Sequence, residues 1–163
     1  MELYYQVDKT EKFSQEEKLV FLKLLKKQGQ VEKPDLLKIE KCLYLCIAWN
    51  KSTPVGIGAI KNVYLTPFKY AKVDELKNQY INEIGYLYVE NSENSNYRGL
   101  GIGKKITHLL LQNLNSNGVF ATTENSVSNG MFHILSHLGF KQAGRPFLGK
   151  KTGKELVLMV FSK

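Results

Sequence analysis

The stretch Asn96-Tyr97-Arg98-Gly99-Leu100-Gly101-Ile102-Gly103-Lys104-Lys105 brings three glycines, an arginine and two lysines together within a short span. An apolar, strand-like run (84–89) precedes it, and an amphipathic helical pattern (106–114) follows it. Glycine lets the backbone approach a ligand closely and adopt positive φ angles. The first turn of a helix offers unpaired N–H groups and a partial positive charge. The stretch therefore predicts an anion-binding loop at the start of a helix.

The spacing of these glycines argues against two familiar phosphate loops. A dinucleotide fold needs G-x-G-x-x-G after the first strand of a βαβ unit. Here the pattern is G-x-G-x-G, and it follows the fourth predicted strand. A Walker loop needs Ser or Thr after its Gly-Lys pair, whereas Lys105 stands there.

The remaining chain alternates strand and helix signals around this loop. Strands are predicted at 3–7, 42–49, 55–63, 82–90, 119–122, 140–148 and 155–161. Helices are predicted after the Ser14/Glu17 capping box as far as Gly29, and at 34–41, 106–114 and 131–138. Turns are expected at 50–54, 115–118 and 149–154. We therefore expect an α+β, or mixed α/β, fold in a single domain over 1–163, with about six to seven strands in one mixed sheet and about four flanking helices.

Residues 64–80 form the segment that is hardest to assign. They contain Pro67, three tyrosines and several lysines, with one short helix expected near 74–78. Such a segment between two strands is either a candidate substrate loop or a plain connector.

The charge of the chain favours anionic ligands without indicating a nucleic acid. The net charge is +8, but the only arginines are Arg98 and Arg145. A diffuse lysine coat is typical of a solvated surface, whereas nucleic-acid readers rely more on arginine. The field still favours an anionic cofactor or substrate.

The cysteines and the N-terminus indicate the compartment. Cys42 and Cys46 would be roughly 13 Å apart on one strand, too far for a disulfide, so we expect two buried, reduced thiols. The first residues lack the basic start and apolar core of a signal peptide, and no run is long enough to cross a bilayer. We expect a cytoplasmic protein without a membrane partner.

The segment from Arg98 to Gly103 matches R-x-x-G-x-G, and Leu138-Gly139-Phe140 provides a helix end followed by "GF". On these residues and the element order, the sequence resembles the GNAT superfamily of acetyl-CoA-dependent N-acetyltransferases. The resemblance implies acetyl-CoA as co-substrate and no metal. It implies that the coenzyme A pyrophosphate is held by Arg98, Gly99, Leu100, Gly101, Ile102, Gly103 and Lys104. It also implies that pantetheine lies along the main chain of Leu87, Tyr88 and Val89.

The approach to the loop departs from the family pattern. The gap between the end of the strand and Arg98 is longer than usual, so 91–96 resembles an insertion of a few residues. The insertion either bulges outward without effect or alters how the loop meets the cofactor.

Glu83 is the candidate general base. A neutral amine must attack the thioester, so a proton has to leave. Several GNAT enzymes resemble this chain in placing a glutamate at the start of the same strand. The alternative is a solvated carboxylate at a strand end.

Two further positions of the family lie near the last predicted helix. Leu135 stands where relatives often place a tyrosine that protonates the departing thiolate. Ser136, His133 or water could substitute, or the thiolate leaves unassisted. For the asparagine that touches pantetheine, the strict count falls on Ser128, with Asn129 beside it and Asn125 a turn earlier; we favour Asn129.

His133 and His137 have the spacing of a zinc helix. Ile134 replaces the glutamate of H-E-x-x-H, and no third ligand is evident. We expect no metal site.

The sequence thus predicts an N-acetyltransferase that moves an acetyl group to a primary amine by direct attack in a ternary complex. The acceptor is a small molecule or a peptide, and a homodimer is a candidate assembly. A catalytically silent coenzyme A-binding sensor or interaction module is the alternative, and a basic RNA-associated protein is a third reading.

Overall fold

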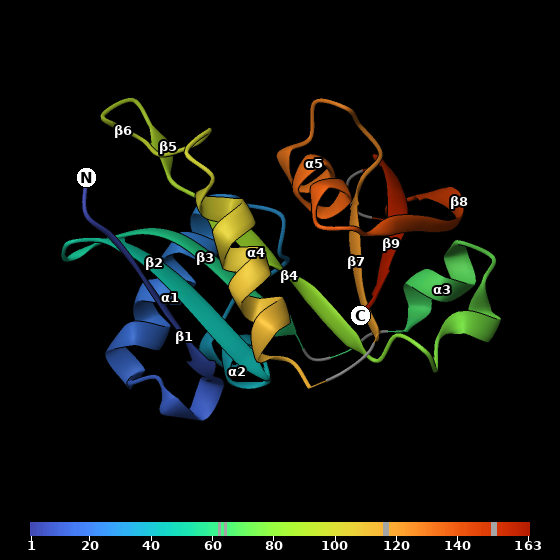
Figure 1. The fold of residues 1–163 in the computed structure, drawn as a ribbon, viewed down its shortest axis with the longest axis horizontal. Coiled ribbons are helices and arrows are strands. Elements are labelled where there is room, and N and C mark those ends of the chain that lie inside the picture. Colours follow the sequence, from blue (N-terminus) through green and yellow to red (C-terminus); the bar gives the residue numbers. More distant parts are fainter. Residues whose placement is uncertain (62, 64, 116–117, 151–152) are drawn as a thin grey trace. The chain divides into compact units, whose positions relative to one another are not determined.

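The computed structural model describes residues 1–61, 63, 65–115, 118–150 and 153–163 (Figure 1). The chain divides into two compact units. The first comprises Met1–Asn62 with Gly85–Leu114, and the second comprises Val63–Ile84 with Asn115–Lys163. The main sheet has seven strands in the order β1-β2-β3-β4-β7-β9-β8. The prediction of one domain over 1–163 stays a prediction.

The first unit is built on three antiparallel strands and most of a fourth. The strands are β1 (Leu3–Lys9), β2 (Tyr44–Asn50), β3 (Thr53–Lys61) and the later part of β4 (Asn82–Val89). The helices are α1 (Gln15–Gln28), α2 (Leu36–Glu40) and α4 (Ile102–Asn113), with a 3-10 turn at Thr10–Lys12.

Local signals fix the ends of α1 as the sequence predicts. The Ser14 hydroxyl accepts a hydrogen bond from the Glu17 amide at 3.1 Å, and the Glu17 carboxylate accepts one from the Ser14 amide at 2.8 Å. Gly29 ends the helix with a φ of 75°. The capping box and the glycine cap are both confirmed.

The two faces of these strands carry different helices (Figure 1). Leu45, Ile47, Ile57 and Ala59 form one buried cluster with α1 and α2. Side chains alternate between faces along a strand, so Gly56 and Gly58 point to the opposite face. There they meet α4, because a Cβ on Gly58 would lie 2.6 Å from Cγ2 of Ile106. The two glycines therefore allow α4 to lie close against β3.

The second unit holds the other half of the sheet. The start of β4 pairs in parallel with β7 (Gly118–Glu124), β7 pairs antiparallel with β9 (Glu155–Ser162), and β9 pairs antiparallel with β8 (Lys141–Leu148). One face packs a cluster that includes Phe68 and Ala71 of the 63–81 insert against Phe120 and Leu158. The opposite face carries α5 (Gly130–His137), whose closing segment stacks Phe140 on Phe161.

Three expectations about local structure need correction. The main helix of the insert is α3 (Thr66–Tyr70), while 74–76 form only a 3-10 turn, which gives five α-helices within the described residues. Pro67 fits the start of α3, since proline tolerates the first helical turn. Residues 91–96 are a small hairpin, β5 (Asn91–Ser92) with β6 (Ser95–Asn96), and not a plain loop. Cys42 precedes β2 and does not lie on it.

The structure also bears on the predictions about the cysteines and about membrane-spanning segments. Both cysteines carry reduced, buried thiols, and burial raises the pKa of the Cys46 thiol to about 12. In the described chain, no helix is long and apolar enough to cross a membrane. Four predicted segments are only partly described by the structure: the strand 55–63, the 64–80 insert and the turns at 115–118 and 149–154. Residues 62, 64, 116–117 and 151–152 of these segments lie outside the described residues.

Candidate functional site

The glycine loop forms an open helix start. Gly99 and Gly101 both have a φ of 78°, a left-handed conformation that side-chain-bearing residues rarely adopt. A Cβ at either position would meet nothing within 4 Å, so the loop borders open space. Gly101 is the N-cap of α4, and the helix begins at Ile102. The predicted start near 106 was therefore too late, and Ile102, Gly103 and Lys104 form the first turn.

The first turn of α4 has the electrostatics of an anion site. As far as the structure describes the chain, no side chain caps this turn and it contains no acidic residue. Lys104 and Lys105 are exposed in the same turn, although cations there oppose the helix dipole by roughly 0.3–1 kcal/mol each. A bound anion would remove this conflict and use the free N–H groups. Leu100, also predicted to bind the cofactor, is 52% exposed on the same loop.

Arg98 stands at the entrance of this loop. Its backbone amide donates a hydrogen bond to Oδ1 of Asn96 at 3.0 Å, which fixes the turn before Gly99. Its side chain is exposed, and a guanidinium binds phosphate in a bidentate manner. The structure thus leaves Arg98 beside an open helix start.

The inserted hairpin leaves the loop's connection to β4 intact. The Tyr97 amide donates a hydrogen bond to the Glu90 carbonyl at 3.0 Å, so the chain returns to the end of β4 before Arg98. The Tyr97 hydroxyl accepts one from Asn50 at 3.1 Å. Of the two alternatives for 91–96, this geometry favours an outward bulge.

The end of β4 is held by α1 and β3. Nε2 of Gln28, the last residue of α1, donates to the Leu87 carbonyl at 2.9 Å. The Glu90 amide donates to the Val55 carbonyl at 2.9 Å. Leu87, Tyr88 and Val89 are all half-buried. Hydrogen bonds with α1 and with β3 therefore hold the end of β4, the strand predicted to carry pantetheine.

Gly56 links β4 to the helix start. A Cβ there would lie 3.1 Å from Ile102, the first residue of α4, and 3.3 Å from the Tyr88 carbonyl. The predicted strand and the predicted loop thus meet at one small residue of β3. Tyr86, two residues earlier on β4, has a φ of 56°, which is rare outside glycine and costs roughly 1–3 kcal/mol.

A buried carboxylate beside Tyr88 was not predicted. Glu90 is 8% exposed and accepts hydrogen bonds from Nζ of Lys27 at 2.6 Å and from the Tyr88 hydroxyl at 3.1 Å. Burial alone would raise the pKa of Glu90, but the bonds from Lys27 and Tyr88 lower that pKa below its ordinary value. The Tyr88 pKa is raised, first by burial and then by the neighbouring Glu90 charge. The sequence offered no signal for a pair whose members lie 63 residues apart.

Glu83 lies near the start of β4 in the second unit. It pairs with Phe120 of β7 and is 7% exposed. It is therefore not a solvated carboxylate at a strand end. Its role as general base stays a prediction.

Asn129 is the N-cap of α5. Its Oδ1 accepts hydrogen bonds from the Phe132 amide at 3.1 Å and the Thr123 hydroxyl at 3.2 Å. A contact with pantetheine would therefore use the amide nitrogen. Ser128 and Ser126 share a hydrogen bond at 2.8 Å, while Asn125 donates to Glu155.

The positions considered for a general acid differ in exposure. Leu135 is fully buried, so it belongs to the packing of α5. Ser136 is exposed, and the His133 ring makes a hydrogen bond with the Val127 carbonyl. Among the described residues, no three His, Cys, Asp or Glu side chains are grouped as a metal site would require.

The chain, with its seven-stranded sheet and the open start of α4, has the GNAT fold. No family model matches the chain in sequence. No curated protein matches it in sequence either.

Solved structures similar to the chain include several named as acetyltransferases. The chain is similar to the NatC complex bound to Gag peptide and CoA, with a TM-score of 0.70, 19% identity and coverage of 100% of this chain and 99% of that one. It is similar to Escherichia coli ElaA, with a TM-score of 0.69, 14% identity and coverage of 99% and 100%. It is also similar to a GNAT-family acetyltransferase from Bacillus cereus, with a TM-score of 0.66, 13% identity and 98% coverage of both chains. These likenesses establish the fold.

Proposed function

We propose that the chain is an acetyl-CoA-dependent N-acetyltransferase acting on a primary amine. The observation that carries the proposal is the open, uncapped start of α4 behind two left-handed glycines and Arg98. The residues fit a pyrophosphate, because the loop borders open space and its first turn holds cations with no acid beside them. Arg98, Lys104 and the amides of the first turn would hold it.

The residues predicted on β4 would then have the following roles. Main-chain groups of Leu87, Tyr88 and Val89 would hold pantetheine along β4. A main-chain N–H near Tyr88 or Val89 would polarise the thioester carbonyl, as in an oxyanion hole. Glu83 would accept the proton of the amine as the nitrogen–carbon bond forms and the carbon–sulfur bond breaks. Binding both substrates together supplies much of the rate through proximity.

The acceptor is proposed as a peptide or a small amine. The NatC structure was determined with a peptide and CoA, which supports testing peptides first. A cytoplasmic location completes the proposal, and a homodimer is its candidate assembly.

Coenzyme A binding tests the loop directly. Arg98→Glu places a carboxylate where the pyrophosphate belongs, and a hydrogen bond to a charged group contributes roughly 1.5–3 kcal/mol. We expect coenzyme A to bind at least about tenfold more weakly in calorimetry. Lys141→Glu, the same charge reversal on β8 in the other unit, is the matched control and should leave affinity unchanged. Equal affinity of the Arg98 variant and the wild type would refute the loop assignment.

Turnover tests the base separately. Glu83→Gln should lower the release of coenzyme A thiol with an accepted amine while leaving coenzyme A affinity unchanged. Equal turnover at every pH would remove Glu83 from the mechanism.

A silent coenzyme A-binding module is the second candidate, and the burial of Leu135 favours it. A fully buried leucine provides no acid where relatives often place one. This candidate predicts coenzyme A binding in calorimetry without thiol release for any amine or peptide in a broad panel.

A further inference from the structure

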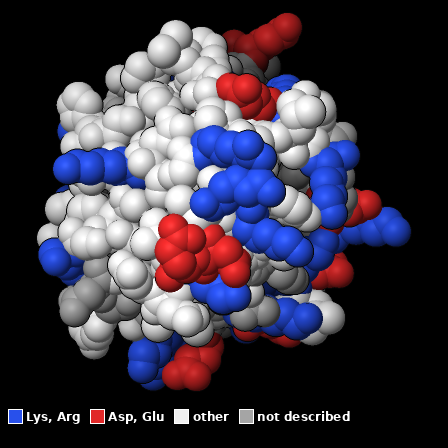
Figure 2. Space-filling view, turned by 90° about the vertical axis from the view of Figure 1, so that its right-hand side faces the viewer, with Lys and Arg blue, Asp and Glu red and all other residues white. Residues whose placement is uncertain are grey.

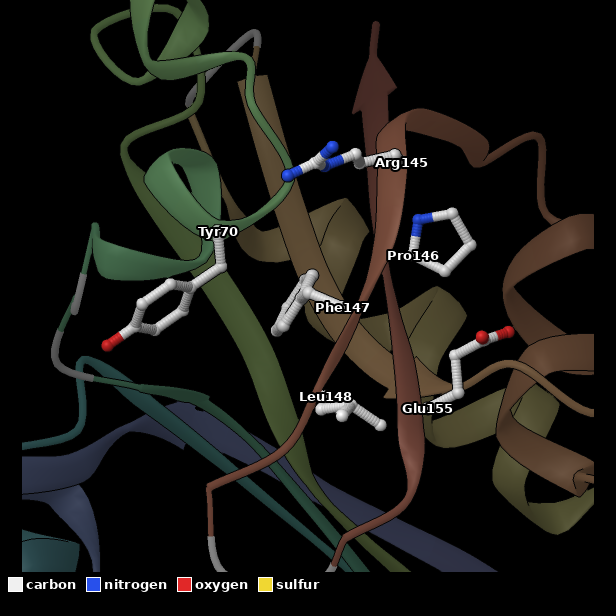
Figure 3. Close-up of a pocket in the computed structure, with 6 residues that line it drawn as sticks. All are labelled: Tyr70, Arg145, Pro146, Phe147, Leu148 and Glu155. Atoms are coloured by element: carbon white, nitrogen blue, oxygen red, sulfur yellow. The ribbon is translucent and has the colours of Figure 1, made fainter.

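A hollow in the second unit does not converge on one ligand. It has a volume of about 400 Å³, and its lining comes from α3, β8 and the start of β9 (Figure 3): Tyr70, Arg145, Pro146, Phe147, Leu148 and Glu155. Leu148 pairs with Glu155, so their side chains lie on the same face of these strands. Phe147, the residue before Leu148, points to the opposite face, where its ring contacts Tyr70 with ring centres 5.7 Å apart. The lining is thus divided between two faces and has no common centre.

Arg145 lies in a bulge of β8 beside this hollow. The pairing of β8 with β9 is interrupted between Ala143 and Phe147, and the Arg145 amide donates a hydrogen bond to the Ala71 carbonyl at 2.9 Å. The guanidinium and the Glu155 carboxylate point apart (Figure 3). On the side of the molecule shown in Figure 2, Lys and Arg side chains also stand beside Asp and Glu side chains. Neither Arg145 nor the charge on that side therefore selects a ligand.

An unsatisfied oxygen in the first unit, at the end of α1, does indicate a ligand. Nε2 of Gln28 donates a hydrogen bond to the Leu87 carbonyl at 2.9 Å. Oε1 of the same carboxamide is buried and has no hydrogen-bond partner within the described residues. Buried polar atoms are almost always hydrogen-bonded, so this oxygen is a candidate to receive a donor from a ligand. One half of the carboxamide thus holds β4, and the other half is free.

The carbonyl of Leu87 lies on the outer edge of β4, away from β3. The Glu90 amide donates to the Val55 carbonyl of β3 at 2.9 Å. Main-chain groups alternate between the two edges along a strand, so Leu87 and Val89 direct theirs to the edge opposite β3. The pantetheine arm is predicted to lie along these residues. The carboxamide at the end of α1 therefore reaches the edge that the arm would follow.

The surroundings of Gln28 favour a neutral donor over an ammonium group. The neighbouring Lys27 places its ammonium 2.6 Å from Oε2 of Glu90. The other oxygen of Glu90 accepts hydrogen bonds from the Tyr88 hydroxyl at 3.1 Å and the Asn91 amide at 3.2 Å. Because this carboxylate is already bonded through both oxygens, an incoming cation would meet Lys27 without a free acid to balance it. A secondary amide N–H is neutral, and pantetheine carries N–H groups of this kind.

We propose that Gln28 binds coenzyme A directly, with Oε1 accepting a hydrogen bond from an amide N–H of the pantetheine arm. The last torsion of a glutamine side chain is soft, so this half-buried residue can present the oxygen to the edge of β4. The inference rests on the proposed function, because it takes coenzyme A as the ligand. It adds a side chain of α1 to the main-chain groups of β4.

Ligand truncation combined with substitution tests this contact by calorimetry. Coenzyme A and 3′-phospho-ADP share the nucleotide and the pyrophosphate, but only coenzyme A carries pantetheine, so the ratio of their affinities isolates the arm. Gln28→Met removes both halves of the carboxamide, whereas Gln28→Lys keeps a donor for the Leu87 carbonyl and removes the acceptor. We expect both variants to lower the ratio about three- to tenfold, and an effect of the lysine charge on the phosphates cancels in the ratio. Gln30→Met, at an exposed glutamine beyond the end of α1, is the matched control and should leave the ratio unchanged.

The lysine variant separates ligand binding from a structural role. If Gln28 only held β4 through Leu87, Gln28→Lys would keep the wild-type ratio and only Gln28→Met would lower it. The side-chain amide signals of Gln28 in the ¹⁵N-labelled full chain give a second readout by NMR. They should shift on addition of coenzyme A and much less on addition of 3′-phospho-ADP. Thermal melts show whether each variant is folded.

Three results would overturn the inference. The first is an unchanged ratio in both variants, and the second is a wild-type ratio in Gln28→Lys alone. The third is tighter binding of coenzyme A to Gln28→Met, which would show that Gln28 competes with the arm for the Leu87 carbonyl. Failure of the wild type to bind coenzyme A would contradict the proposed function itself. Binding that depends on Arg98 but not on Gln28 would contradict only this inference.

Discussion

Valine in place of Gly58 tests the close contact that positions α4. A Cβ at this position would lie 2.6 Å from Cγ2 of Ile106 and 3.2 Å from Leu110. Both side chains are fully buried, so neither can move into solvent. Overfilling a packed core costs roughly 1–3 kcal/mol.

Two effects act in the opposite direction. Replacing glycine lowers the entropy of the unfolded chain, which stabilises by roughly 0.4–1 kcal/mol. Valine also suits a strand, on a scale that spans about 1 kcal/mol. If α4 did not lie close to β3, Gly58→Val would therefore stabilise the protein. Because valine adds three carbons at a 2.6 Å contact, we expect the upper end of the packing cost and a net loss of about 1 kcal/mol or more.

Thermal unfolding followed by circular dichroism measures this change, with urea unfolding followed by Trp49 fluorescence as a second probe. A loss of 1 kcal/mol lowers Tm by roughly 2–4 °C in a chain of this size. Gly130→Ala is the control, because a Cβ there meets nothing within 4 Å and its Tm should not fall. An unchanged or higher Tm for Gly58→Val would refute the contact.

Two further predictions concern the end of β4. The folded-state pKa of Glu90 is lowered from its ordinary 4.5, so the stability that it contributes is present above that pH and is lost as pH falls through the folded-state pKa. The difference in unfolding free energy between wild type and Glu90→Gln, measured in urea from pH 3 to 7, should therefore shrink on acidification; a constant difference would contradict this. Replacing 91–96 with a two-residue turn should keep coenzyme A affinity within about twofold, because the Glu90–Tyr97 hydrogen bond already closes the hairpin. A loss beyond about tenfold in calorimetry would show that the hairpin shapes the loop.

The elements that the sequence predicted well are those encoded by neighbouring residues. The Ser14/Glu17 capping box and Gly29 define both ends of α1 without any distant contact. Likewise, glycine readily adopts positive φ angles that few other residues adopt, and the two loop glycines Gly99 and Gly101 both have a φ of 78°. The start of α4 was placed too late because Gly103 suggested a loop, although Ile102 next to it is buried and packs beside Gly56.

Features that depend on distant pairs were not predictable. Lys27 and Glu90 become partners only when α1 packs beside the end of β4. Nothing in the sequence distinguishes Gly144 from other glycines. The reason for a glycine at this position is evident only in the structure, where Ala71 of the insert lies against β8 and leaves no room for a Cβ. For Glu83 the sequence left a general base and a solvated strand end both open, because its pairing partner Phe120 on β7 lies nearly forty residues further along the chain.

The contact between Ala71 and β8 also has a consequence for self-association. β8 is the last strand of the sheet, and exposed strand edges invite other chains to add a strand. At the bulge, the Arg145 amide is already bonded to Ala71, and Pro146 has no amide hydrogen to offer. An incoming strand would therefore find the Arg145 donor already occupied at the bulge. The insert thus blocks the addition of another strand at this point of the edge.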